Sequence, residues 1–180
     1  MRKHRKDEIL KYILLAGGVL GLSMIAPKLP YEILKQYLKE QEFQQRRLRN
    51  DIDHLKRRGL ILKEKGKKGL ILRLTSEGAR QAIFSQALDP IMPSPKWNKK
   101  WHLLVFDIPE KNRNKRKRIT EILQAVGCIQ VQQSVYVSPY YFRDKISIIA
   151  QYYRLEACFF YFEVSDQPAF EIFRSYFFNK

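Results

Sequence analysis

The sequence of 180 residues predicts an α+β protein built from two domains. Three observations support this prediction. The first half shows helical periodicity followed by a hairpin, the second half alternates strand-like and helix-like segments, and a proline-rich segment at 89–95 separates them. Prolines at this density interrupt helices and favour extended backbone. We therefore expect domains over residues 1–88 and 96–180, joined by a semi-rigid linker over 89–95.

The composition indicates a globular protein that attracts polyanions. Hydrophobic residues make up 45% of the chain, which is enough for a packed core. The 34 lysines and arginines outnumber the 18 acidic residues, giving a formal net charge of +16. Nucleic acid is the polyanion that soluble proteins meet most often, so it is the first partner to consider.

The cysteines and histidines suggest no metal or disulfide framework. Cys128 and Cys158 belong to no zinc-ligand spacing, and the three histidines form no metal-binding pattern. Both cysteines lie in apolar segments, so we expect them to be small core residues. No cofactor is predicted.

The N-terminal segment resembles a signal peptide only in part. Basic residues at 2–6 precede an apolar run at 12–25, but no small-residue cleavage site follows and three glycines interrupt the run. The run has 14 residues, whereas a membrane-spanning helix needs about 20. We expect a buried helix, no membrane contact and a cytoplasmic protein.

Three helices are predicted in the first domain. The first covers residues 7–24 and the second covers 31–41, with Pro30 in its first turn. An apolar stripe is expected on the second helix, formed by Ile33, Leu34, Tyr37 and Leu38. The third helix is expected over 44–58, with Gly59 as its C-terminal stop.

The third helix has two chemically distinct faces. At about 100° per residue, Leu48, Ile52 and Leu55 fall on one narrow face. The opposite face carries Arg46, Asn50, Asp53 and Arg57. Arginine matches the O6/N7 edge of guanine and asparagine the N6/N7 edge of adenine, so this face suits the major groove of DNA. For an isolated helix, a solvated surface explains the same charges.

The segment after this helix favours the DNA-binding interpretation. Two β-like runs at 60–65 and 70–74 flank a glycine-bracketed turn with lysines at its tip. A helix that ends in glycine, followed by such a hairpin, is the order of a winged helix-turn-helix. Residues 47–61 resemble the recognition helix and first wing strand of many bacterial winged-helix regulators. A final helix is expected to open at Thr75-Ser76-Glu77-Gly78 with an N-cap.

Base edges and phosphates are the expected partners of the polar residues on the helix and the wing. The predicted DNA-binding residues are Arg46, Arg47, Arg49, Asn50, His54, Lys56, Arg57, Lys63, Lys65, Lys67, Lys68, Lys115 and Arg116. The last two belong to a basic segment at 111–118. Two roles fit that segment equally: contact with DNA outside the core site, or a solvated first turn of a helix.

The second domain is predicted to have the order β-α-β(β)-α-β. A buried strand at 101–107 precedes a helix at 111–126, and residues 128–138 alternate as a half-buried strand or a bent pair of strands. A helix at 142–155 and a strand at 157–164 follow. This order predicts a ferredoxin-like βαββαβ sheet with helices on one face. The aromatic tail after residue 170 is expected to pack on this sheet or across a dimer.

This second domain resembles a known family. The segments Trp101-His102-Leu103-Leu104-Val105-Phe106-Asp107-Ile108-Pro109-Glu110 and Gln132-Gln133-Ser134-Val135-Tyr136-Val137-Ser138-Pro139 are similar to the central domain of PaaX-type transcriptional repressors. That domain is itself similar to the small CRISPR adaptation nuclease of the Cas-two type. PaaX-type proteins carry a winged helix before it, and the resemblance covers roughly residues 7–165. The further C-terminal domain of full-length PaaX proteins has no counterpart, so no acyl-CoA-type effector is assigned.

These features predict a sequence-specific regulator of transcription that binds double-stranded DNA, and more specifically a repressor. A single winged helix buries limited surface, so we expect a homodimer that reads an inverted repeat, with the second domain as the dimer contact.

Two alternatives concern the second domain. Asp107 matches the metal-binding aspartate of the CRISPR nuclease, and two copies across a dimer axis would hold one Mg²⁺ for phosphodiester cleavage. A structural role for Asp107, capping the turn at Ile108-Pro109 or the helix that follows, is the favoured interpretation. The other alternative is a CRISPR-adaptation scaffold that binds DNA without cutting it.

Overall fold

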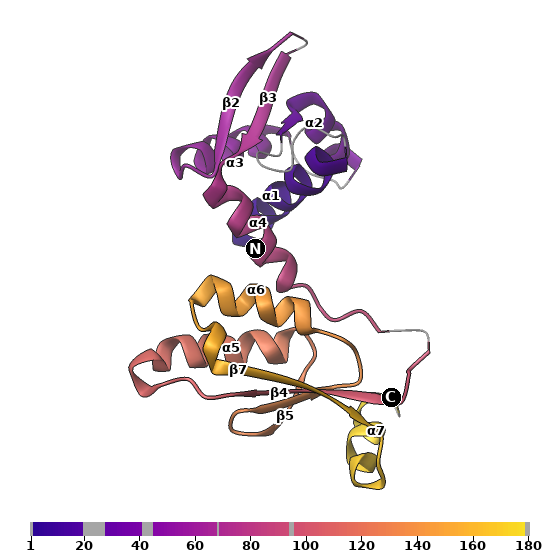
Figure 1. Cartoon of the computed structure of the whole chain (residues 1–180). Coiled ribbons are helices and arrows are strands. Elements are labelled where there is room, and N and C mark those ends of the chain that lie inside the picture. Colours follow the sequence, from indigo (N-terminus) through magenta and orange to yellow (C-terminus); the bar gives the residue numbers. More distant parts are fainter. Residues whose placement is uncertain (1, 20–27, 41–44, 68, 94–95, 179–180) are drawn as a thin grey trace. The chain divides into compact units, whose positions relative to one another are not determined.

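The structure is a computed structural model, and it describes residues 2–19, 28–40, 45–67, 69–93 and 96–178. The chain contains both helices and sheets, as an α+β protein does (Figure 1). It divides into two compact units, Met1–Gln86 and Ala87–Lys180. No helix among the described residues is long and apolar enough to cross a membrane.

Helices α1, α2, α3 and α4 and a small three-stranded sheet make up the first unit. In the sheet, β3 lies between β1 and β2 and pairs antiparallel with both. The hairpin β2–β3 extends away from the helices (Figure 1). The elements in chain order are α1 (Arg2–Val19), β1 (Lys28–Pro30), α2 (Tyr31–Glu40), α3 (Gln45–Arg57), β2 (Ile61–Gly66), β3 (Gly69–Leu74) and α4 (Ser76–Ala87).

Two boundaries differ from the sequence-based expectation. Helix α1 begins at Arg2 rather than at residue 7, and the expected helical residues 20–24 lie outside the described residues. Pro30 does not open α2, because it ends the strand β1 and pairs with Ile71 of β3. A proline is tolerated at the end of an edge strand, where its missing N–H interrupts no ladder.

The core of the first unit lies between its helices and β3. Leu34 and Leu38 of α2 are buried, as predicted, whereas Ile33 and Tyr37 of the same expected stripe are 40% and 37% exposed. Tyr37 stacks on Tyr12 of α1 with ring centroids 3.8 Å apart. The buried residues that join these helices to α3 and the sheet are Ile9, Leu10, Ile13, Leu29, Leu48, Ile52, Leu55, Leu60, Ile61, Leu72, Leu74 and Ala82.

A tight junction joins the end of α3 to the start of α4. Gly59 ends α3 with φ of +68°, the left-handed conformation expected of a C-terminal glycine. The Leu60 carbonyl accepts a hydrogen bond from the Thr75 N–H at 3.1 Å. The Thr75 hydroxyl accepts one from the Gly78 N–H at 3.0 Å, which confirms the predicted N-cap.

A four-stranded sheet with helices organises the second unit. The strand order is β5-β6-β4-β7, and every neighbouring pair is antiparallel. Helices α5 and α6 lie on the same side of the sheet (Figure 1). The main elements are β4 (Lys100–Phe106), α5 (Arg113–Ala125), β5 (Ile129–Gln132), β6 (Val135–Ser138), α6 (Arg143–Tyr153), β7 (Phe159–Ser165) and α7 (Glu171–Phe178), with short 3-10 turns at Glu110–Asn112, Glu156–Cys158 and Pro168–Phe170.

The two faces of this sheet are filled differently. Leu104 and Phe106 of β4 are buried on the face that carries α5 and α6, and Ile119 and Leu123 of α5 are buried as well. The register places Phe160 and Phe162 of β7 opposite Val105 and Leu103, on the other face. These two phenylalanines are 53% and 51% exposed, so this part of the second face is an apolar surface open to solvent.

The alternating segment at 128–138 forms a pair of strands rather than one strand. Tyr136, on its glutamine-bearing face, is fully buried and stacks near Phe106. Val131, on its valine-bearing face, is 42% exposed. A register shift between Gln130 and Gln132 breaks the expected alternation, because Gln130 pairs with Tyr136 whereas Gln132 pairs with Val135.

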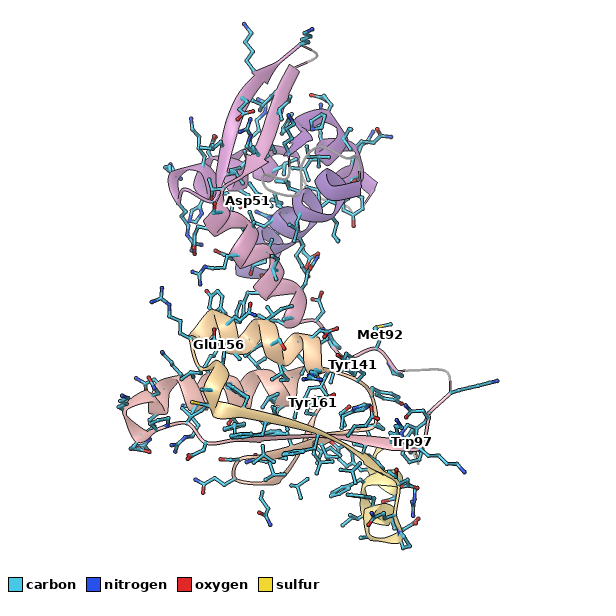
Figure 2. All side chains as sticks on the ribbon, viewed as in Figure 1. Asp51, Met92, Trp97, Tyr141, Glu156 and Tyr161 are labelled. Carbon is cyan, nitrogen blue, oxygen red and sulfur yellow. The ribbon has the colours of Figure 1, made fainter. Side chains whose placement is uncertain are left out.

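The aromatic tail packs on one end of β4. Phe170, Phe173 and Phe177 surround the buried Trp101, with ring centroids 5.8 to 6.0 Å away. Trp97 lies beside the same cluster (Figure 2). The Trp101 indole N–H donates to Asp166 Oδ1 at 2.7 Å. Packing on the sheet, the first of the two expected roles of this tail, is thereby confirmed.

The first residues of the proline-rich segment are hydrogen-bonded to the second unit. The Ile91 N–H donates to the Val126 carbonyl at 2.8 Å, and Lys145 donates to the Asp89 carbonyl at 2.8 Å. Both cysteines are free. Burial raises the pKa of the Cys128 thiol to about 12, whereas Cys158 is only half-buried, in a 3-10 turn.

Candidate nucleic-acid interface

Helix α3 is anchored along one side. Leu48, Ile52 and Leu55 are at most 1% exposed, as the sequence predicted. Asp51, on the same helix, is buried and forms an ion pair with Arg5 of α1 (Figure 2). Because a buried carboxylate is costly unless it is paired, this contact offsets the cost of burying Asp51 and links α3 to α1. Sequence reasoning missed the pair, since its members are 46 positions apart.

The opposite side of α3 carries exposed polar side chains. Asn50 and Arg57 lie on this side, with Arg49 and Lys56 flanking them, and all four are exposed. The backbone of Arg46 and Arg47 belongs to α3, but their side chains lie outside the described residues. We call Asn50, Asp53 and Arg57 the outer face of α3.

One acidic side chain interrupts this basic surface. Asp53 is exposed on the outer face and accepts a hydrogen bond of 2.5 Å from the Lys63 ammonium group of β2. This bond holds the pKa of Asp53 below its ordinary value, and the charges of Lys63, Arg57 and Lys56 lower it further. The sequence placed Lys63 on the wing as a phosphate contact, whereas the structure gives it a partner within the same unit.

The hairpin presents two exposed lysines. Lys65 lies near the end of β2, and Lys67 lies in the turn that follows. The ion pair between Arg73 of β3 and Glu64 of β2, at 2.7 Å, links the two strands. Lys68, the remaining predicted residue of this turn, lies outside the described residues.

His54 occupies the border between the buried and exposed sides of α3. Its side chain is half-buried, and its Nδ1 atom has no hydrogen-bond partner among the described residues. Burial lowers the pKa of His54, and the positive charges of Lys6, Arg58 and Arg57 lower it further. The nearby cations thus oppose protonation of the imidazole in the free protein.

Positive charge is concentrated in the first unit. Residues 1–86 contain 20 lysines and arginines against nine acidic residues, a formal net charge of +11. Residues 87–180 contain 14 against nine, a net charge of +5. The strongest attraction for a polyanion therefore lies in the unit that carries α3 and the hairpin.

Lys115 and Arg116, the two DNA contacts predicted in the second unit, both form hydrogen bonds within that unit. Lys115 is half-buried and donates to the Tyr153 carbonyl of α6 at 3.0 Å. Arg116 is also half-buried, and it binds Glu110 at 3.2 Å and the Ile108 carbonyl. The structure therefore supports a packing role for both, and the exposed cations of this segment are Lys111, Arg113, Lys117 and Arg118.

Asp107 lies directly after β4 with its side chain exposed. Among the described residues, none forms a hydrogen bond or ion pair with its carboxylate, and the caps of the following 3-10 turn and of α5 involve no side-chain bond. The expected capping role of Asp107 was therefore wrong. No group of three or more His, Cys, Asp or Glu residues lies close enough to hold a metal ion in the described part of the chain.

Comparison with known proteins finds a family model that the second unit matches. Residues 94–171 match the family model described as the PaaX protein central Cas2-like domain. This match supports a PaaX-family protein. A search of curated proteins found no match to the chain.

Proposed function

We propose that this protein is a sequence-specific, double-stranded DNA-binding regulator of the PaaX type, and that it acts as a dimeric repressor of transcription. In this proposal the first unit is a winged helix-turn-helix, in which α3 is the recognition helix and β2–β3 is the wing. The observation that carries it is the division of α3 into an anchored side and an exposed side that carries Asn50 and Arg57.

The geometry of DNA supports this assignment. The major groove admits one α-helix, and its base edges are read by side chains that project from the helix. A rigid anchor on the inner side holds the backbone from which Asn50 and Arg57 project, so only their side chains need to be ordered on binding. The exposed Lys65 and Lys67 of the adjacent hairpin supply the positive charge that the phosphate backbone attracts.

The second unit supports the dimeric part of the proposal. The order β5-β6-β4-β7, with antiparallel pairing throughout and α5 and α6 on one face, supports a ferredoxin-like βαββαβ domain. Its open sheet face exposes Phe160 and Phe162. An exposed apolar patch of this kind is typical of an interface, and a second copy of the chain would cover it with a two-fold axis that fits an inverted repeat.

The test is selection of bound duplexes from a random pool by the purified protein in metal-free buffer. We expect enrichment of an inverted repeat whose half-sites lie about one helical turn apart, bound by two chains. Enrichment of no sequence, with equal binding to every duplex, would contradict the proposal. Sedimentation of the complex on the selected duplex gives the number of chains.

Removing the wing lysines should change the salt dependence of binding. We expect Lys65→Ala and Lys67→Ala each to weaken binding to all duplexes alike. Each should also reduce the steepness of log association constant against log salt concentration by about one unit. The reason is that a protein with one phosphate contact fewer releases one counterion fewer when it binds. Arg80→Ala on α4, where Arg80 is paired with Glu77, is the matched control. An unchanged slope in both lysine variants would show that the wing does not contact the phosphate backbone.

His54 should make DNA binding depend on pH. In the free protein the pKa of His54 is lowered by burial and by Lys6, Arg58 and Arg57. Phosphates near α3 would raise it, so the complex takes up a proton, and affinity should increase as the pH falls from the bound pKa to the free pKa. Titration of affinity between pH 8 and pH 5.5 should show this increase in the wild type and a smaller one in His54→Gln. An identical pH profile in both proteins speaks against the prediction.

A nuclease is the second candidate function, and the exposed, unpartnered carboxylate of Asp107 is the observation that favours it. The nearest acid in sequence, Glu110, is paired with Arg116, so Asp107 is the free carboxylate that the described residues of one chain offer at this position. Mg²⁺ would need Asp107 from two copies to be held and to activate water. Labelled DNA and RNA incubated with Mg²⁺ or Mn²⁺ test this candidate: cleavage by the wild type that Asp107→Ala abolishes would favour the nuclease.

A further inference from the structure

Asp53 is an acidic residue on the surface of α3 that the proposed function places against DNA. It lies at the centre of the outer face of α3, three positions from Asn50 and four from Arg57, and its side chain is 53% exposed. An ionised carboxylate repels the phosphate backbone, and the lowered pKa keeps this carboxylate ionised. Its effect on DNA binding therefore depends on what its oxygens contact.

Lys63 contacts one of the two oxygens of the Asp53 carboxylate. Its ammonium group donates to Asp53 Oδ1, and no described residue donates a hydrogen bond to the second oxygen, Oδ2. The lysine side chain is only 25% exposed, so the hairpin holds it beside the helix. The bond from Lys63 orients the Asp53 carboxylate and partly neutralises its charge. Oδ2 can still accept hydrogen bonds from a ligand.

We propose that Asp53 reads a cytosine in the DNA major groove, with Oδ2 accepting a hydrogen bond from the N4 amino group, and that Lys63 is a positioning residue for this contact. The inference rests on the proposed function of α3 as a recognition helix. Lys63 thereby acts on base selection through Asp53, in addition to offsetting the carboxylate's repulsion from phosphates.

Hydrogen-bond chemistry gives the direction of the preference. An ionised carboxylate only accepts hydrogen bonds, so it matches the amino group of cytosine and opposes the N7 and O6 acceptors of guanine and the O4 acceptor of thymine. Adenine offers an amino group beside the N7 acceptor, a pair that suits an amide better. Asparagine at position 53 would therefore shift the preference from cytosine towards adenine, with almost no change in side-chain shape.

The experiment compares sequence selection from one random duplex pool by the wild type, Asp53→Asn, Lys63→Met and Glu77→Gln. Glu77 is an exposed acid of α4 paired with Arg80, so Glu77→Gln is the matched control for loss of a charged pair. We expect the wild type to prefer cytosine about 10-fold or more at one position of each half-site. Asp53→Asn should lose that preference in favour of adenine, and Lys63→Met should relax it at the same position. The control should keep every preference.

The outcomes separate this inference from the proposed function. A wild type that selects no sequence overturns both. A selected site that Asp53→Asn still reads with the same preference at every position overturns the role of Asp53 alone. Equal weakening on all duplexes in both variants, together with a lower unfolding temperature, would make the Asp53–Lys63 pair only a link between helix and hairpin, and would also overturn the inference.

Discussion

The double variant Asn50→Ala/Arg57→Ala should lose about 100-fold or more of its affinity for the selected duplex. Each of these exposed side chains is expected to make a bidentate contact with a base, and such a contact contributes about 1–3 kcal/mol of discrimination. Binding to random DNA should fall much less, because it depends on phosphate contacts. Titrations of both duplexes at one salt concentration measure the difference.

A variant of a flanking cation gives the matched comparison. Lys56 is exposed beside the outer face of α3, and Lys56→Ala should weaken selected and random duplexes by the same factor. If the double variant behaves like Lys56→Ala, then Asn50 and Arg57 contact phosphates and the bases are read elsewhere. Unfolding should be unchanged in all of these variants, since the three side chains lie at the surface.

Gly78→Ala should destabilise the first unit by about 3 kcal/mol, the upper end of the range for over-packing. In an exposed helix the same change stabilises by about 1 kcal/mol. Here a Cβ atom at Gly78 would overlap the backbone carbonyl of Leu60, which no side-chain rotation can relieve. Leu60 leads directly into β2, so relief of the overlap would shift the hairpin against α3.

Chemical denaturation of the full chain measures this effect. Ser76→Ala, at an exposed position in the same turn of α4, should change stability by about 0.5 kcal/mol or less. Partial loss of DNA affinity is also expected for Gly78→Ala at temperatures where it remains folded. A stability equal to or above that of the wild type would show that the junction of α3 and α4 is less tightly packed than described.

Elements with strong periodicity or clear end signals were predictable from the sequence. The spacing of Leu48, Ile52 and Leu55 predicted the buried side of α3, and Gly59 predicted its end. The glycines that bracket the turn predicted the hairpin β2–β3. Each of these signals acts over a few residues, which is why a single sequence reveals them.

Features that depend on distant partners were not predictable. The strand β1 has three residues, and only its pairing with β3 makes it a strand. Lys115 and Arg116 look like surface cations, and only the fold brings them to the Tyr153 and Ile108 carbonyls. Lys63 was placed correctly on the hairpin, but its bond to Asp53 requires the relative orientation of β2 and α3. Local sequence carries no record of such contacts.

Methylation interference on the selected duplex tests the central claim most directly, because it reports which groove the protein occupies. Dimethyl sulfate modifies guanine N7 in the major groove and adenine N3 in the minor groove. If α3 lies in the major groove with Arg57 on a guanine, N7 methylation within each half-site should block binding, and Arg57→Ala should lose that sensitivity at one guanine. Interference confined to adenine N3, or an Arg57→Ala pattern identical to that of the wild type, would contradict the account.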